Sequence, residues 1–187
     1  MIVRLTVGAM AIGLLVGCAS EVPPTSGGGL QPQADPAVER QVAIYSAIIR
    51  QLVTVDHTFG DGDPGFRVIY VLDRTDGGAG DPEGTGQGGQ PLAPEVQEGI
   101  KAALKDLPPV EFVSDRNSVV GSDTEGNQVH NEGALVTLAP IPDGEDRVEV
   151  DASLYMANVA GTWLTYVLEG SGADWKVTGT TGAVGIS

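Results

Sequence analysis

The most constraining feature of the sequence is the segment Arg147–Tyr155, in which apolar and polar residues alternate. The apolar set is Val148, Val150, Ala152 and Leu154, and the polar set is Arg147, Glu149, Asp151 and Ser153. A period of two places one set on each face of a half-buried antiparallel β-strand. The apolar face needs a second layer to cover it, and a chain of 187 residues has room for one such domain.

Further strands are predicted on both sides of this segment. Phe66–Leu72 is a short, nearly continuous apolar run, which is typical of a strand covered on both faces. The other predicted strands are Val110–Val113, Ala134–Leu138, Thr162–Leu168 and Trp175–Gly179. Turn residues at Gly161 and in Glu169–Asp174 connect the last strands as a C-terminal meander.

Two helices are predicted before most of these strands. The first begins at Asp35-Pro36, a favourable cap followed by a favourable first residue, and its apolar spacing continues to about Val53. The second begins near Pro94 and is stopped by Pro108-Pro109. The predicted fold class is α+β over residues 35–187, with two helices packed on a curved, mainly antiparallel sheet. Cystatin-like and NTF2-like cones have this order of elements.

The N-terminus indicates a secretion signal. Arg4 supplies a positive charge, and Leu5–Val16 is a run of twelve residues with nothing more polar than threonine. This is the length of the apolar part of a signal peptide and is too short to span a bilayer. The sequence Leu15-Val16-Gly17-Cys18 resembles the lipobox of bacterial lipoproteins, whose cysteine sulfur receives a diacylglyceryl group before cleavage in front of it. The resemblance implies a signal peptide over residues 1–17 and lipidation at Cys18.

Residues 18–34 are predicted to be a lipidated cysteine followed by a flexible tether rich in Pro, Gly and Ser. Two or more acyl chains, at about 0.8 kcal/mol per buried CH₂, hold a protein on a membrane essentially permanently. The expected location is therefore the extracytoplasmic face of the cell membrane, contacted through the lipid anchor only. The chain has 10 Lys+Arg and 25 Asp+Glu, a net charge of −15, which argues against nucleic acid and anionic headgroups as direct partners.

A second resemblance concerns the folded part of the chain. The strings Leu135–Ile141, Thr165–Glu169 and Trp175–Gly182 are similar to those in uncharacterised secreted lipoproteins of high-GC Gram-positive bacteria. The resemblance extends from about Arg40 to Ser187. It implies the same location and supplies no catalytic or binding residue.

The loop Asp76–Gln90 contains seven glycines, and Gly84-x-Gly86-x-x-Gly89 formally matches a dinucleotide-binding fingerprint. That chemistry requires the glycines to lie directly between the end of a strand and the start of a helix. The predicted strand ends a dozen residues earlier, and the flanking charges are the acidic Asp81 and Glu83. We therefore expect a flexible, solvated loop without a cofactor.

No metal site and no catalytic residue is predicted. The acidic stretches Asp61–Asp63 and Asp73–Glu83 could offer oxygen ligands to Ca²⁺, but their order does not fit an EF-hand, and Asp-Gly pairs favour turns. His57 and His130 are the only imidazoles and lie in no zinc or triad motif. Cys18 is the only cysteine, which excludes an internal disulfide.

Aromatic residues are scarce (3 Phe, 4 Tyr and 2 Trp), which argues against a carbohydrate-stacking platform. Trp163 and Trp175 are expected to form a cross-strand pair. The predicted function is a non-enzymatic binding or accessory domain of the cell envelope, whose partner is an envelope protein or a small ligand. Two alternatives remain open: a small-ligand carrier with a cone-shaped cavity, and a secreted hydrolase with a non-local acidic or histidine site. In the binding interpretations the polar loop Ser114–Glu132 is the lid or contact element.

Overall fold

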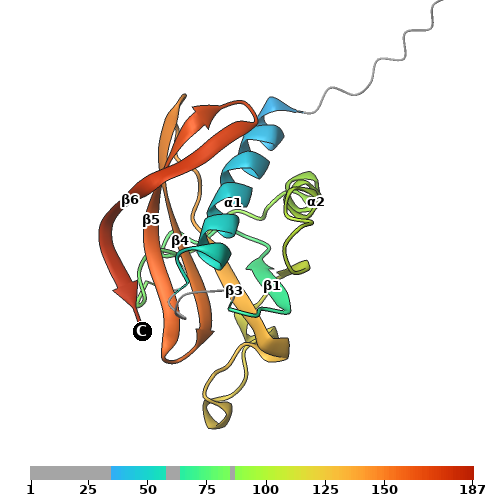
Figure 1. Ribbon diagram of the computed structural model, residues 1–187, viewed down its shortest axis with the longest axis vertical. Coiled ribbons are helices and arrows are strands. Elements are labelled where there is room, and N and C mark those ends of the chain that lie inside the picture. The colour runs from blue at the N-terminus through green and yellow to red at the C-terminus, as the bar shows by residue number, and fades with distance from the viewer. Residues whose placement is uncertain (1–34, 58–63, 85–86) are drawn as a thin grey trace, which may run out of the picture. The chain divides into compact units, whose positions relative to one another are not determined.

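Two α-helices and an open, six-stranded mixed sheet make up the α+β fold of the computed structural model (Figure 1). The structure describes residues 35–57, 64–84 and 87–187, and residues 34–187 form one compact unit. The predicted signal peptide, Cys18, the tether and Asp61–Asp63 lie outside the described residues.

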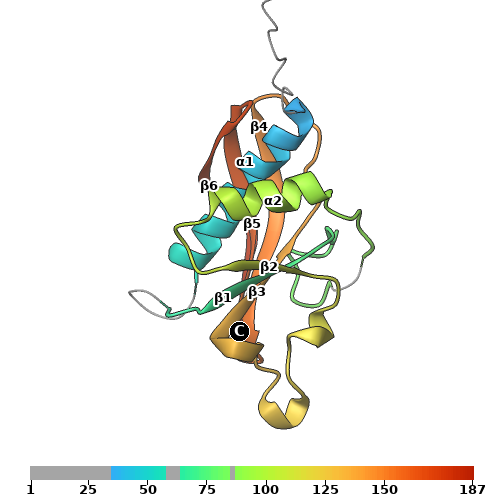
Figure 2. The same cartoon turned by 90° about the vertical axis from the view of Figure 1, so that its right-hand side faces the viewer.

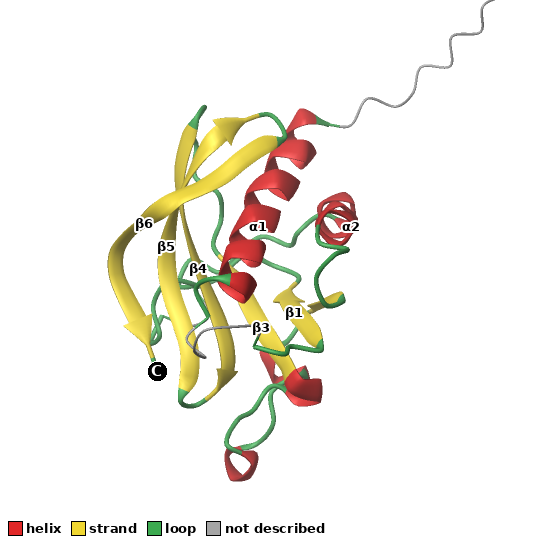
Figure 3. Cartoon of the chain, viewed as in Figure 1, coloured by secondary structure: helices red, strands yellow, loops and turns green. Residues whose placement is uncertain are grey.

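The elements occur close to the predicted positions (Figure 3). The helices are α1 (Pro36–Thr54) and α2 (Pro94–Ala103). The strands are β1 (Val68–Leu72), β2 (Val110–Val113), β3 (Gly133–Leu138), β4 (Arg147–Ala157), β5 (Ala160–Ser171) and β6 (Asp174–Ile186). Three short 3₁₀ turns, η1 (Arg116–Ser118), η2 (Asp123–Glu125) and η3 (His130–Glu132), lie between β2 and β3.

The strands are arranged in the order β2-β1-β3-β4-β5-β6. β3 to β6 form an antiparallel meander as predicted, whereas β1 pairs in parallel with both β2 and β3. Parallel neighbours require crossover connections. The segment that contains α2 makes the crossover from β1 to β2, and residues 114–132 make the one from β2 to β3. The sheet is therefore mixed: three of its five strand pairings are antiparallel, as expected, and the two that involve β1 are parallel.

α1 lies against β4, β5 and β6, on what we call the helix face of the sheet (Figure 1). The side chain of Asp35 caps the helix by accepting a hydrogen bond from the backbone N–H of Ala37 at 2.9 Å. The buried side of the helix, which includes Ile44, Ile48 and Leu52, joins one large apolar core with the sheet. This core fills the space between α1 and the helix face.

α2 packs chiefly against α1 and contacts the edge strand β2, as Figure 2 shows. Gly99 permits the close approach, since a Cβ there would lie 2.5 Å from a methyl group of Val42. The helix ends at Ala103, before the predicted end at Pro108-Pro109. Pro108 disfavours the helical conformation of Leu107, and residues 104–107 form non-helical turns.

The two faces of β4 differ in what covers them. Val148, Val150 and Leu154 face the helix core, as the alternation predicts. On the opposite side, which we call the outer face, Arg147 and Glu149 are exposed. Ser153, however, is only 6 % exposed, although the alternation predicts that it faces water. The end of the outer face around Ser153 is covered by residues 114–132, which bury Val119 and Val129 against it.

Candidate functional site

A row of three side chains from neighbouring strands forms the floor of a pocket on the outer face. Thr137 of β3 lies opposite Ser153 of β4, and Ser153 lies opposite Trp163 of β5. Ser153 is more than nine-tenths buried, and its hydroxyl makes no hydrogen bond with any residue that the structure describes. The Ser153 oxygen is not among the fully buried polar atoms that lack a partner, so the hydroxyl is open to the pocket and available to a ligand.

Glycines on both sides make room for the Trp163 indole. Gly161 lies two residues earlier on the same face of β5, and a Cβ there would be 2.4 Å from Cη2 of the indole. Gly185 of β6 lies opposite Trp163, and a Cβ there would be 3.3 Å from the Trp163 Cβ. The half-buried indole therefore extends over Gly161, which in turn lies opposite Tyr155. These glycines are a signal that sequence reasoning missed.

The crossover segment 114–132 supplies one wall. Arg116 of η1 stacks on Tyr155, with its guanidinium carbon 3.8 Å from the ring centroid. The Tyr155 hydroxyl donates to the Asn127 carbonyl at 3.0 Å and reaches Asn158 Oδ1 at 3.3 Å. The Asn127 side-chain amide donates to Asn158 Oδ1 at 2.9 Å. This network fixes the wall to the sheet.

The glycine-rich loop supplies the opposite wall and is more closely packed than an open, solvated loop. A Cβ at Gly78 would lie 1.4 Å from the Gly84 carbonyl oxygen, so the backbones meet directly there. Asp76 Oδ1 accepts hydrogen bonds from the backbone N–H of Gly78 at 2.9 Å and of Gln87 at 3.1 Å. Asp81 Oδ1 accepts one from the N–H of Glu83 at 2.9 Å. Asp76 and Asp81 thus act as turn formers, as predicted, at the rim of the pocket.

The resulting cavity has a volume of about 660 Å³. Its lining combines an indole, Asn amides, four hydroxyls, one guanidinium and two Asp carboxylates, and no His, Lys or Cys is found among the described lining residues. Small-molecule sites typically have volumes of about 300–1,000 Å³ with a few convergent polar groups. The Ser153 and Thr137 hydroxyls and the Asn side chains of this lining can each form hydrogen bonds with a ligand.

The structure does not bring the sequence-based candidate groups together. His57 is buried after the end of α1, and His130 is exposed in η3; neither lines this pocket. Within the residues that the structure describes, no three His, Cys, Asp or Glu side chains are grouped so that they could hold a metal ion. The GxGxxG match does not precede a helix, because α2 begins only at Pro94.

The prediction of a tryptophan pair is wrong. Trp175 lies opposite Gly170 and packs into the helix-face core, whereas Trp163 lies opposite Gly185 and packs on the outer face. The two indoles therefore lie on opposite sides of the sheet. Because β6 continues to Ile186, beyond its predicted end at Gly179, the true partner of Trp163 fell outside the predicted strand.

The strongest perturbation of a titratable group lies in the packed interior, away from the pocket lining. Burial, followed by a hydrogen bond to Asp56, raises the pKa of Tyr166 well above its ordinary value. The hydroxyl of Tyr166 donates to Asp56 Oδ2 at 2.8 Å and so ties β5 to the end of α1. This pair connects two elements and does not face the cavity.

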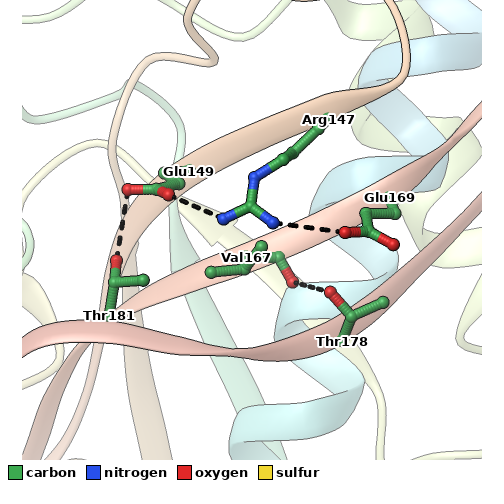
Figure 4. Close-up of polar contacts among 6 residues, drawn as sticks. All are labelled: Arg147, Glu149, Val167, Glu169, Thr178 and Thr181. Atoms are coloured by element: carbon green, nitrogen blue, oxygen red, sulfur yellow. Dashed lines mark hydrogen bonds and ion pairs between the residues drawn. The ribbon is translucent and has the colours of Figure 1, made fainter.

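The far end of the outer face carries an exposed polar cluster (Figure 4). Arg147 donates to Glu149 at 3.0 Å and to Glu169 at 3.2 Å, and the Thr181 hydroxyl reaches Glu149 at 3.2 Å. The three charged side chains are about half exposed, at 52 %, 47 % and 53 %. Ion pairs in such contact with water contribute little to stability.

Comparison of the chain with models of protein families, with characterised proteins and with solved structures gave no match in any of the three. None of the described helices is long and apolar enough to cross a bilayer.

Proposed function

We propose that this protein is a non-enzymatic, lipid-anchored lipoprotein on the extracytoplasmic face of the cell membrane, and that its folded domain binds a small polar ligand in the outer-face pocket. The lipobox-like sequence that ends at Cys18 supports the location. The pocket supports the small-ligand interpretation over that of a scaffold with flat faces. The small-ligand interpretation does not require the cone-shaped cavity expected from the sequence, because this pocket lies on the side of the sheet opposite α1.

One observation carries the proposal. Ser153 lies at the centre of the row Thr137–Ser153–Trp163, and its hydroxyl, which is open to the pocket, has no hydrogen-bond partner within the described residues. A ligand that fills the pocket can replace water at this hydroxyl with a direct hydrogen bond, whose net contribution is about 0.5–1.5 kcal/mol. Arg116, stacked in place on Tyr155, adds a second polar group that is already oriented before a ligand arrives.

A thermal-shift screen of small polar compounds against the full chain tests the proposal. A compound that binds only the folded state at a hundredfold excess over its Kd stabilises that state by about 2.7 kcal/mol. For a chain of this size, this corresponds to a rise in Tm of about 5–10 °C.

Two variants locate the binding. Ser153→Val, which removes the hydroxyl and projects a branched side chain into the pocket, should abolish the shift. Thr180→Val, at an exposed position of β6, is the matched control and should retain it. A shift that survives Ser153→Val would place the binding elsewhere and would contradict the proposal.

A further inference from the structure

The chemistry of the pocket lining also indicates the class of ligand, an inference that rests on the proposed function. We propose that the pocket binds a neutral pyranose sugar, either as a free saccharide or as a unit of a glycan. The sugar ring stacks on the Trp163 indole, and its hydroxyls bond to Ser153 and to the polar side chains around it.

The stacking surface is a single indole held flat. Trp163 is half-buried, and its ring extends along the floor over Gly161. The neighbouring Tyr155 ring is covered by the Arg116 guanidinium and is 8 % exposed, which leaves Trp163 as the aromatic side chain open to a ligand. A pyranose ring presents a face of C–H groups that packs on such an apolar plane, while its hydroxyls point outward at the edges. Scarcity of aromatic residues therefore does not exclude sugar binding, since one positioned indole suffices.

Hydrogen-bonding groups without a protein partner surround the indole. Among the described residues, none bonds to the hydroxyls of Thr137 and Ser153 or to the side-chain amide of Asn117, and Asn158 Nδ2 has no acceptor. Two of these groups are hydroxyls, which both donate and accept, and the amides add further donors and an acceptor. A ligand rich in hydroxyl groups can satisfy such a mixed set, because each of its own hydroxyls also donates and accepts.

The charges in the lining favour a ligand without net charge. Arg116 is the one cation among the described lining residues, and Asp76 and Asp81 stand at the rim. An anionic ligand would meet these carboxylates and the net charge of −15 of the chain, while a cationic ligand, although attracted by that charge, would meet the Arg116 guanidinium inside the lining. A neutral sugar meets neither penalty, and planar guanidinium and carboxylate groups can each bond two adjacent hydroxyls. The volume of about 660 Å³ leaves room for more than one sugar ring.

Isothermal titration calorimetry on the full chain, in a detergent without a sugar headgroup, tests the ligand class. The neutral probes are the methyl pyranosides of glucose, galactose and mannose, together with maltose and cellobiose. The charged probes are succinate as an anion and putrescine as a cation, together with alanine and glycine betaine, zwitterions whose net charge is zero but whose ionised groups cannot replace the hydroxyls of a sugar. We expect saturable binding of at least one neutral probe and none of the charged ones. If a tetrasaccharide binds tenfold more tightly than the methyl glycoside of its own sugar unit, the natural ligand is a unit of a glycan chain and not a free saccharide.

Three variants assign the contacts. Trp163→Ala should weaken sugar binding at least tenfold, whereas Trp163→Phe, which keeps a flat ring, should stay within about threefold of wild type. Ser153→Ala should weaken it at least threefold. If a charged probe binds in a manner sensitive to Ser153→Ala and no sugar binds, the ligand class is wrong and the proposed function stands. If no probe of any class binds, the proposed ligand class and the proposed binding function are both overturned.

Discussion

Ser153 and Leu154 are adjacent in β4 and point to opposite faces of the sheet. Substituting each in turn therefore tests the binding role of the outer face separately from the packing of the helix-face core. Leu154 is fully buried in the helix-face core, and its truncation to alanine should cost about 2–5 kcal/mol. The Ser153 hydroxyl has no hydrogen-bond partner among the described residues, so Ser153→Ala should change the free energy of unfolding by less than about 0.5 kcal/mol. Denaturant unfolding measures both. Equal losses would show that the two faces are wrongly assigned.

Single residues also show why the site could not be derived from the sequence. Arg116, Ser153 and Trp163 come from a crossover segment and two strands, and only the strand register places them together. The alternation in β4 predicts that Ser153 faces solvent, because the pattern indicates only which face of the strand a side chain is on. It cannot report that residues 114–132, far away in the sequence, cover that face. The glycines at 161 and 185 around Trp163 are local clues, but they are meaningful only once the register is known.

At the scale of elements, the glycine-rich loop gives a matched pair of substitutions. A Cβ at Gly78 would lie 1.4 Å from the Gly84 carbonyl oxygen, whereas one at Gly77 would have its nearest neighbour, Gln87 Cβ, at an ordinary 3.6 Å. Gly78→Ala should therefore force the backbones apart, lower stability by about 1–3 kcal/mol and open the rim of the pocket. Gly77→Ala should leave the Tm nearly unchanged. Equal effects in thermal melts would mean that the loop is not packed as described.

The contact between α1 and the chain after α2 predicts that the stability of the fold depends on pH. The Arg50 guanidinium donates to both carboxylate oxygens of Asp106, at 2.7 and 2.8 Å, and these hydrogen bonds lower the pKa of Asp106 from 3.8 to about 2. Because the pKa is lower in the folded state, the contact stabilises the fold fully above about pH 4. This contribution is lost as the pH falls through about 2. Asp106 is exposed, so the effect on stability is small.

Nuclear magnetic resonance can follow the Asp106 carboxyl directly. Its titration midpoint should lie near 2 in the wild-type chain and return toward 3.8 in the Arg50→Gln variant. Lys101→Gln, which removes a cation paired with Glu98 on α2, is the control and should not move it. A midpoint near 3.8 in the wild type would contradict the contact.

The elements were largely predictable because their local patterns are strong. The cap at Asp35-Pro36 and the alternation in Arg147–Tyr155 each specify one kind of structure. The pairing of the strands was not predictable to the same degree. The apolar run of β1 is compatible with parallel or antiparallel neighbours, and only the crossover connections decide between them. In the same way, bulges and the added length of β6 set the partner of Trp163.

For the whole molecule, we expect a covalent lipid anchor at the N-terminus of the mature chain. Because the lipobox-like sequence ends at Cys18, intact-mass analysis of protein extracted from the membrane should show a chain that begins at a diacylglyceryl-modified Cys18. Cys18→Ala should release the protein from the membrane or leave the signal peptide uncleaved. An unmodified chain that begins at any other residue would contradict the anchor, but it would leave the pocket argument untouched.

Acrylamide quenching of tryptophan fluorescence tests most directly whether the outer-face pocket is the binding site. Trp163 is half-buried in the pocket, whereas Trp175 is 5 % exposed in the helix-face core. The Trp163→Phe chain therefore reports the core indole alone. A saturating amount of a compound that raises the Tm should lower the quenching constant of the wild-type chain at least twofold, toward that of Trp163→Phe. Quenching that does not change when the compound binds would contradict the assignment of this pocket.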